Sequence, residues 1–235
     1  MTIDEKEKFD YEIDTLLEIF NKHSPIQESK KIDTEKIKSC IEEMADFIIE
    51  NKTECSALKT WMSENEFYKS PASTKFHGNF DGGLCVHSLM VSVQALRFAK
   101  PLLENFELSP LVNTEEFSAE DIFIACISHD FCKAGSYKVE FHNTKDFMGN
   151  WVRKPIFRTK QDLRNLGHGN ESVLLLLESM PSLVKRRNIL EAVSRHMGFS
   201  DLSPLEELNY SNFLKNPLVL LIQLADQSAA AWWDL

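Results

Sequence analysis

Apolar residues recur every three or four positions along most of the chain, which is the spacing of one face of an α-helix. The first two such stretches are residues 3–22 and 34–50, and most of their other positions are charged. This pattern predicts two amphipathic helices whose charged sides face solvent. A further short helix is expected within residues 52–68.

The sequence Ser70-Pro71-Ala72-Ser73 follows these stretches and predicts a loop. We interpret this loop as the boundary between an N-terminal helical cap, residues 1–70, and a main domain, residues 71–235.

Two later stretches are far more apolar and carry polar residues at specific places. A long helix is expected after Gly83, and His87 should point inward with Leu84 because the two lie about one turn apart. Residues 122–135, IFIACISHDFCKAG, leave almost no polar face until His129 and Asp130. Burying such groups without compensation costs several kcal/mol, roughly, so a metal, an ion pair or a water network is expected there. The ordinary alternative is a core histidine beside a solvated carboxylate.

The pattern changes to strict alternation in residues 137–141 and 150–160, which predicts a small β-hairpin insertion at about 137–160. This segment carries the only basic and aromatic interleaving of the chain, in Trp151, Arg153, Lys154 and Arg158. These four residues are candidates for binding the base and phosphates of a substrate. The equally plausible alternative is a solvated hairpin face.

Helical periodicity returns after residue 166 and brings three more candidate residues. His168 lies between two glycines at the expected start of a helix, and His196 falls in the last turn of another, before Gly198. Residues 217–233 are nearly apolar all round and are expected to be buried, with Asp226 as their one carboxylate. They are too short and too polar to predict a membrane span.

Composition narrows the function classes. The chain has 235 residues and a net charge of −10, which argues against nucleic-acid binding through the overall field but permits a local basic patch. Its five cysteines are an odd number without CxxC spacing, and the acidic N-terminal stretch does not look like a secretion signal. Reduced thiols, mostly in the core, are therefore expected in a cytoplasmic protein.

Six residues form the candidate constellation: His87, His129, Asp130, His168, His196 and Asp226. The pair His129–Asp130 and each of the other four lie on or at the end of a different expected helix, and a helical bundle can direct such side chains inward. Imidazole and carboxylate ligands suit Mn, Fe, Co, Ni or Zn, and Mg is also possible. His23 and His142 lie in polar surroundings and are left out, whereas His77 is ambiguous.

These residues occur in the order H…HD…H…H…D, within HGNFDGGLCVHSL, SHDFCKAG, GHGNES, RHMG and LADQSA. On these motifs, residues 76–232 resemble the HD-domain phosphohydrolase superfamily, and most closely its bacterial and phage members with GHG-x-x-S and HMG motifs. The resemblance implies an all-α fold, an HD-domain helical bundle, in a bacterial cytosol or one infected by a phage.

The resemblance also implies roles for individual residues. His87, His129, Asp130 and Asp226 match the set that binds a first metal. His168 and His196 match the additional histidines of binuclear members, in which Asp130 bridges the two ions. Asp130 and Lys133 are then the expected catalytic residues, and Lys133 is expected near the substrate phosphate.

The expected function is therefore that of a metal-dependent phosphohydrolase, which cleaves a phosphoester of a nucleotide or nucleic-acid-like substrate through a metal-activated water. Single-stranded nucleic acid is one of the partners that this expectation permits. Two alternatives remain. Some HD proteins are di-iron oxygenases with much the same ligands, and a non-catalytic nucleotide-binding module is disfavoured because every ligand position is filled. The pattern predicts neither the specific substrate nor an oligomeric state, and it predicts no membrane partner.

Overall fold

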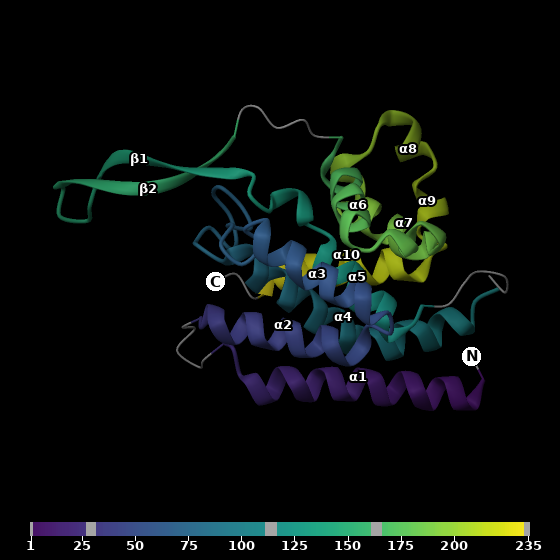
Figure 1. The fold of residues 1–235 in the computed structure, drawn as a ribbon. Helices are drawn as coiled ribbons and strands as arrows, with labels where there is room; N and C mark the ends of the chain where they lie inside the picture. The colour runs from purple at the N-terminus through teal and green to yellow at the C-terminus, as the bar shows by residue number, and fades with distance from the viewer. Residues whose placement is uncertain (1, 27–31, 111–116, 161–165, 233–235) are drawn as a thin grey trace.

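The computed structural model describes residues 2–26, 32–110, 117–160 and 166–232 of the chain. These parts are mainly helical and include one small antiparallel sheet (Figure 1). The helices are α1 (Ile3–His23), α2 (Thr34–Ile48), α3 (Lys52–Glu64), α4 (Gly83–Glu107), α5 (Ala119–Ser128), α6 (His168–Ser179), α7 (Arg187–Arg195), α8 (Pro204–Leu208), α9 (Tyr210–Phe213) and α10 (Pro217–Trp232). The strands are β1 (Tyr137–Lys145) and β2 (Trp151–Thr159). The predicted mainly helical fold with a small hairpin is confirmed.

Helices α1 and α2 are amphipathic, as their periodicity predicts, and lie side by side along one side of the molecule (Figure 1). Thr2 and Glu5 form a capping box that begins α1, and the side chain of Asp33 accepts a hydrogen bond from the backbone of α2. Each helix buries an apolar stripe, represented by Leu16 in α1 and Ile41 in α2, both with 0% exposure. Burial of these stripes, rather than helix propensity alone, stabilises the pair.

The centre of the molecule is built on α4, whose first half is buried almost all round. It packs against α5 and α10, while α6, α7, α8 and α9 gather at the side opposite α1 (Figure 1). One apolar cluster contains side chains from both sides of residue 70, including Ile41 and Leu89. The predicted cap and main domain thus share a core, and the division at residue 70 stays a prediction.

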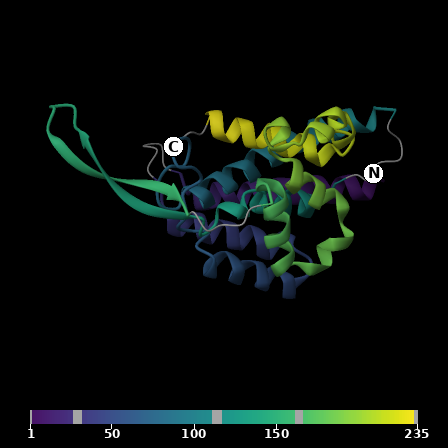
Figure 2. The ribbon, with the colours of Figure 1, turned by 90° about the horizontal axis from the view of Figure 1, so that it is seen from above.

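The hairpin projects from the helical body (Figures 1 and 2). Strands β1 and β2 pair antiparallel without interruption, from Tyr137 opposite Thr159 at the base to Lys145 opposite Trp151 at the far end. β1 extends four residues beyond the predicted strand end at Phe141, because His142 to Lys145 continue the pairing.

Helix α10 corrects one prediction, because it is not buried all round. Its neighbours α4, α5 and α7 cover one side, and Leu220 and Leu224 on the other side are 37% and 45% exposed. Across the described ranges, no helix combines the length and the apolar character that crossing a membrane requires.

Candidate metal centre

The start of α4 positions His87. Gly82 has a positive φ of 82°, and a Cβ atom on Gly83 would lie 1.9 Å from the carbonyl oxygen of Gly78. Any larger residue at position 83 would therefore push the preceding loop away from the helix. One turn later, His87 points into the protein and is only 6% exposed.

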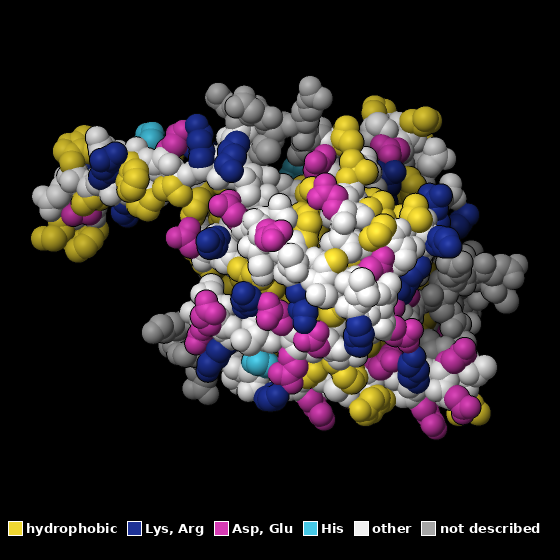
Figure 3. All heavy atoms as spheres, viewed as in Figure 1, with side chains coloured by type: hydrophobic (Ala, Val, Ile, Leu, Met, Phe, Trp, Pro, Cys, Tyr) yellow, Lys and Arg dark blue, Asp and Glu magenta, His cyan; other side chains and the backbone are white. Residues whose placement is uncertain are grey.

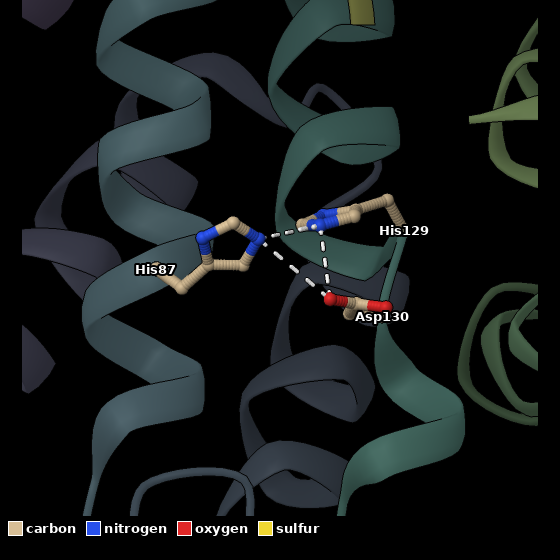
Figure 4. Close-up of side chains that lie close together, drawn as sticks. All are labelled: His87, His129 and Asp130. Carbon is tan, nitrogen blue, oxygen red and sulfur yellow. Dashed lines mark hydrogen bonds and ion pairs between the residues drawn. The ribbon is translucent and has the colours of Figure 1, made fainter. Parts of the chain in front are cut away.

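The end of α5 positions His129 and Asp130. Ser118 and Asp121 form the capping box that begins this apolar helix, and regular helix ends at Ser128. His129 is the residue after the last helical position, and the chain then enters a short 3-10 turn, Phe131–Lys133. Figure 4 shows His129 and Asp130 facing His87 across the gap between α4 and α5.

A close approach of α6 and α7 brings the two later histidines to the same region. His168 is the first residue of α6, and His196 directly follows the last residue of α7. A Cβ atom on Gly169 would lie 2.1 Å from the carbonyl oxygen of Ser194, so only glycine permits this contact between the helix ends.

Imidazole nitrogens and carboxylate oxygens meet at this point from four helices or their ends. The Nε2 atom of His87 lies 3.3 Å from Nε2 of His129 and 3.0 Å from Oδ1 of Asp226. Asp130 lies between the histidines, with Oδ2 3.3 Å from Nε2 of His129 and Oδ1 3.5 Å from Nε2 of His196.

Two backbone carbonyls determine how the histidines face the centre. The Nδ1 atom of His129 lies 2.7 Å from the carbonyl oxygen of Cys126, and Nδ1 of His196 lies 2.8 Å from that of Val193. A carbonyl oxygen only accepts, so each Nδ1 must carry the proton. The Nε2 atom of each ring then faces the centre, which is the orientation of a metal-ligating histidine.

The neighbours of the two carboxylates hold them ionised. Burial would lower the pKa of His129, but Asp130 raises it. Burial alone would raise the pKa of Asp130, but Lys133 and His129 hold that pKa well below its usual range. Burial would likewise raise the pKa of Asp226, but His87 and His129 lower it. The pKa of His87 is lowered because burial outweighs the attraction of Asp226, so two ionised carboxylates lie beside a histidine that favours its neutral form.

Some polar atoms of the site lack the hydrogen bonds that burial demands. Oδ1 of Asp130, Nε2 of His196 and Nδ1 of His168 are buried without a hydrogen-bond partner among the described residues. Buried polar atoms normally have a hydrogen-bond partner. Three unsatisfied atoms in one place therefore indicate a site that binds something, not an ordinary core.

The buried side chains of His87, His129, Asp130 and His196, with the partly buried Asp226, could therefore hold a metal ion. The predicted ligands fall into three overlapping groups, and within each group the ligand atoms lie within 4.8 Å of one another. The groups are His87 with His129 and Asp130, His129 with His196 and Asp226, and Asp130 with Cys132 and His168. All six predicted ligands are thus brought together.

Cys132 is the member that the sequence did not single out. It lacks a CxxC partner, and burial raises its pKa to about 12, as for a thiol in the core. Its backbone N–H donates to the hydroxyl of Ser172 in α6, which holds the 3-10 turn near His168. The only signal in the sequence was its position two residues after Asp130. The ambiguous His77 lies beside the site as well, with its ring centroid 4.7 Å from that of His87.

Lys133, the other predicted catalytic residue, lies at the edge of the centre. Its Nζ donates to Oδ2 of Asp130 at 2.6 Å, and 14% of its side chain is exposed. Burial would lower the pKa of Lys133, but Asp130 raises it, so the amine stays protonated at neutral pH.

The predicted substrate-binding residues of the hairpin are not part of this cluster. Trp151 lies at the far end of the hairpin and is 71% exposed, and Arg153 is two residues closer to the base. Trp151 and Arg153 share one face of the hairpin, and Lys154 and Arg158 lie on the other face. There the Nε atom of Arg158 lies 3.5 Å from a carboxylate oxygen of Glu140. The hairpin projects away from the helices that carry the metal ligands (Figures 1 and 2).

Comparisons of the chain with protein-family models, with curated proteins and with solved structures found no match. The fold and the site thus define a mainly helical protein with a buried His/Asp cluster able to hold a metal ion.

Proposed function

We propose that this chain is an HD-domain phosphohydrolase, which cleaves a phosphoester of a nucleotide or of a nucleic acid with the help of bound divalent metal. The main support is the convergence of all six ligands of the H…HD…H…H…D order on one buried centre. Residues as distant in sequence as His87 and Asp226 are 3.0 Å apart there. A core histidine whose hydrogen bonds are satisfied would not need several other histidines and carboxylates around it.

The donors fit two ions better than one. Asp130 is common to the group around His87 and to the group around His168, and its two oxygens face different partners. A carboxylate in this position can serve two neighbouring cations. Two imidazoles whose Nε2 atoms face the centre, two further histidines and two carboxylates suit Mn, Fe, Co, Ni or Zn.

Divalent metal bound to such ligands supplies Lewis-acid polarisation of a phosphoryl oxygen and a nucleophilic water at neutral pH. The chain's own residues provide the rest. The carbonyls of Cys126 and Val193 fix the direction of His129 and His196. Lys133 offers a compact positive charge beside Asp130, where it can bind a non-bridging phosphate oxygen and stabilise the charge that develops during cleavage.

Two variants test this proposal, Asp130→Ala and Lys133→Ala. Each is purified and its metal content and manganese-dependent cleavage of bis(p-nitrophenyl) phosphate and a nucleotide panel are measured. Asp130→Ala should lose metal and activity, because it removes the shared carboxylate. Lys133→Ala should retain metal but lose turnover by about 10²–10³-fold, the usual effect of removing one transition-state contact. His23→Ala, outside the cluster and paired with Glu43, is the matched histidine control.

Wild-type metal content and rate in Asp130→Ala would show that the site is wrongly assigned. Two irons per chain with oxygen uptake and no phosphoester cleavage would replace the hydrolase by the oxygenase.

A further inference from the structure

The hairpin differs in charge from the rest of the molecule. Residues 137–160 contain six of the 26 basic residues of the chain but only two of its 36 acidic residues. The hairpin is thus a basic arm on an acidic protein. Its exposed apolar side chains are Val139, Phe141, Phe147, Met148 and Trp151.

The strand register separates two faces of this arm. Directly opposed residues share a face, and faces alternate along each strand. One face, which we call the aromatic face, contains Tyr137, Val139, Phe141, Asn143 and Lys145 of β1 with Trp151, Arg153, Pro155, Phe157 and Thr159 of β2. All four aromatic side chains of the two strands therefore lie on one face.

Cations lie among these rings on the same face. The guanidinium of Arg153 lies 4.6 Å from the ring centroid of Phe141, and Nζ of Lys145 lies 5.3 Å from that of Trp151. Both rings are more than half exposed, and the space-filling view shows basic and apolar side chains mixed along the arm (Figure 3). Exposed rings and adjacent cations are the two elements that bind single-stranded nucleic acid, by base stacking and by phosphate neutralisation.

The aromatic face begins next to the candidate metal centre. Tyr137 is its first residue, and the hydroxyl of the preceding Ser136 donates to the carbonyl oxygen of Cys132 at 2.5 Å, two residues after Asp130. The base of the hairpin is fixed there, since Lys160 donates its backbone N–H to the carbonyl oxygen of Ser136 and its Nζ to that of Gly135. A strand bound along this face would therefore lead to the metal ligands.

The length of the arm determines which substrate can use it. From Tyr137 to Lys145 the strand spans about 26 Å at 3.3 Å per residue. A mononucleotide held at the metal ligands cannot also reach Trp151. A stacked single strand with 3.4 Å per nucleotide would need about eight nucleotides to do so.

We infer that the aromatic face of the hairpin binds single-stranded nucleic acid and directs it to the metal centre, so that the substrate is a polymer rather than a mononucleotide. This inference rests on the proposed function and names its substrate class. A second copy of the chain is the other candidate occupant. It is disfavoured because Arg153 and Lys145 would have to be desolvated in a protein interface, whereas phosphates pair with them directly.

The test is fluorescence anisotropy with labelled single-stranded DNA and RNA of 12 and of 3 nucleotides, in EDTA to prevent cleavage. Phe141→Ala and Trp151→Ala should each weaken binding of the longer oligonucleotide by about 5–100-fold, the effect of losing one stacking platform. Arg153→Glu should also reduce the dependence of binding on salt. Binding of the trinucleotide should change less. Thr144→Ala, on the opposite face at the same distance from the base, is the matched control.

Circular dichroism and light scattering after size exclusion establish that each variant is folded and report its mass. Unchanged oligonucleotide affinity in Phe141→Ala and Trp151→Ala would overturn the inference. So would a change in oligomeric state that accounts for the loss of binding, because the face would then join two copies.

Manganese-dependent cleavage of bis(p-nitrophenyl) phosphate separates this inference from the proposed function. Cleavage of the small diester without hairpin-dependent binding would overturn the inference alone. Hairpin-dependent binding without metal or cleavage would instead overturn the proposed function.

Discussion

The six metal-ligand candidates show what a residue pattern can predict. Their identities follow from the sequence, because each histidine or aspartate lies in an apolar or glycine-flanked setting. The distances between these side chains do not follow from the sequence. Cys132 and His168 are 36 positions apart, and only the packing of α6 against the 3-10 turn brings them within ligand distance. The Nδ1 bonds to the carbonyls of Cys126 and Val193 likewise depend on side-chain rotamers.

Gly169 is the residue whose substitution should separate helix packing from ligand chemistry. Gly169→Ala places a methyl group against the backbone of Ser194 at a position where neither helix end can give way easily. Greater helix propensity would stabilise by up to about 1 kcal/mol. Overpacking should outweigh it and leave a net loss of about 2 kcal/mol.

Urea unfolding measures this loss, and elemental analysis should show reduced metal content, because His168 and His196 both move. Leu174→Ala, a half-exposed position on α6, is the control for the helix. Full metal content and unchanged stability in Gly169→Ala would show that the contact does not position the histidines.

At the scale of elements, the junction between α5 and α7 illustrates an interaction that periodicity cannot reveal. Arg186 lies just before α7 and donates to Glu120 at 2.6 Å and also to Asp121, both in the first turn of α5. Asp121 is only 5% exposed, so its carboxylate depends on this guanidinium and on its own capping box.

Arg186→Ala should therefore lower the free energy of unfolding by about 2 kcal/mol, since it leaves a buried carboxylate without its cation. The estimate lies below the range for fully buried pairs because a third of the Arg186 side chain is exposed. Thermal and urea unfolding measure the loss, and Lys185→Ala removes an exposed neighbouring charge as a control. Equal stability of the two variants would contradict the assigned role.

The elements differ in how well the sequence predicts them. α1 and α2 end within two residues of the predicted bounds, because alternating charged and apolar positions define a single buried face. The short helices α8 and α9 were not predicted, since they bury no side chain and follow no clear period. The exposed side of α10 was missed because composition alone does not show how many neighbours surround a helix.

At the scale of the whole molecule, the acidic helical body and the basic hairpin have different roles in the proposed function. The body provides the ligands, and the hairpin provides an exposed surface whose base contacts the backbone of Cys132 through Ser136. The sequence predicted the hairpin and its basic residues, but not the direction in which the hairpin projects from the helical body. Direction depends on the Ser136 and Lys160 contacts at its base, which involve backbone groups common to every residue.

The central claim is that the His/Asp cluster binds metal, and elemental analysis of the protein after dialysis against manganese tests it most directly. The wild-type chain should retain about two ions, as in two-metal hydrolytic sites. His168→Ala, which removes a ligand from one of the three groups, should retain about one, and Asp130→Ala should retain little. Bound metal should also raise the free energy of unfolding, by about 2.7 kcal/mol at a hundredfold excess over Kd. A wild-type chain that retains no ion would contradict the account.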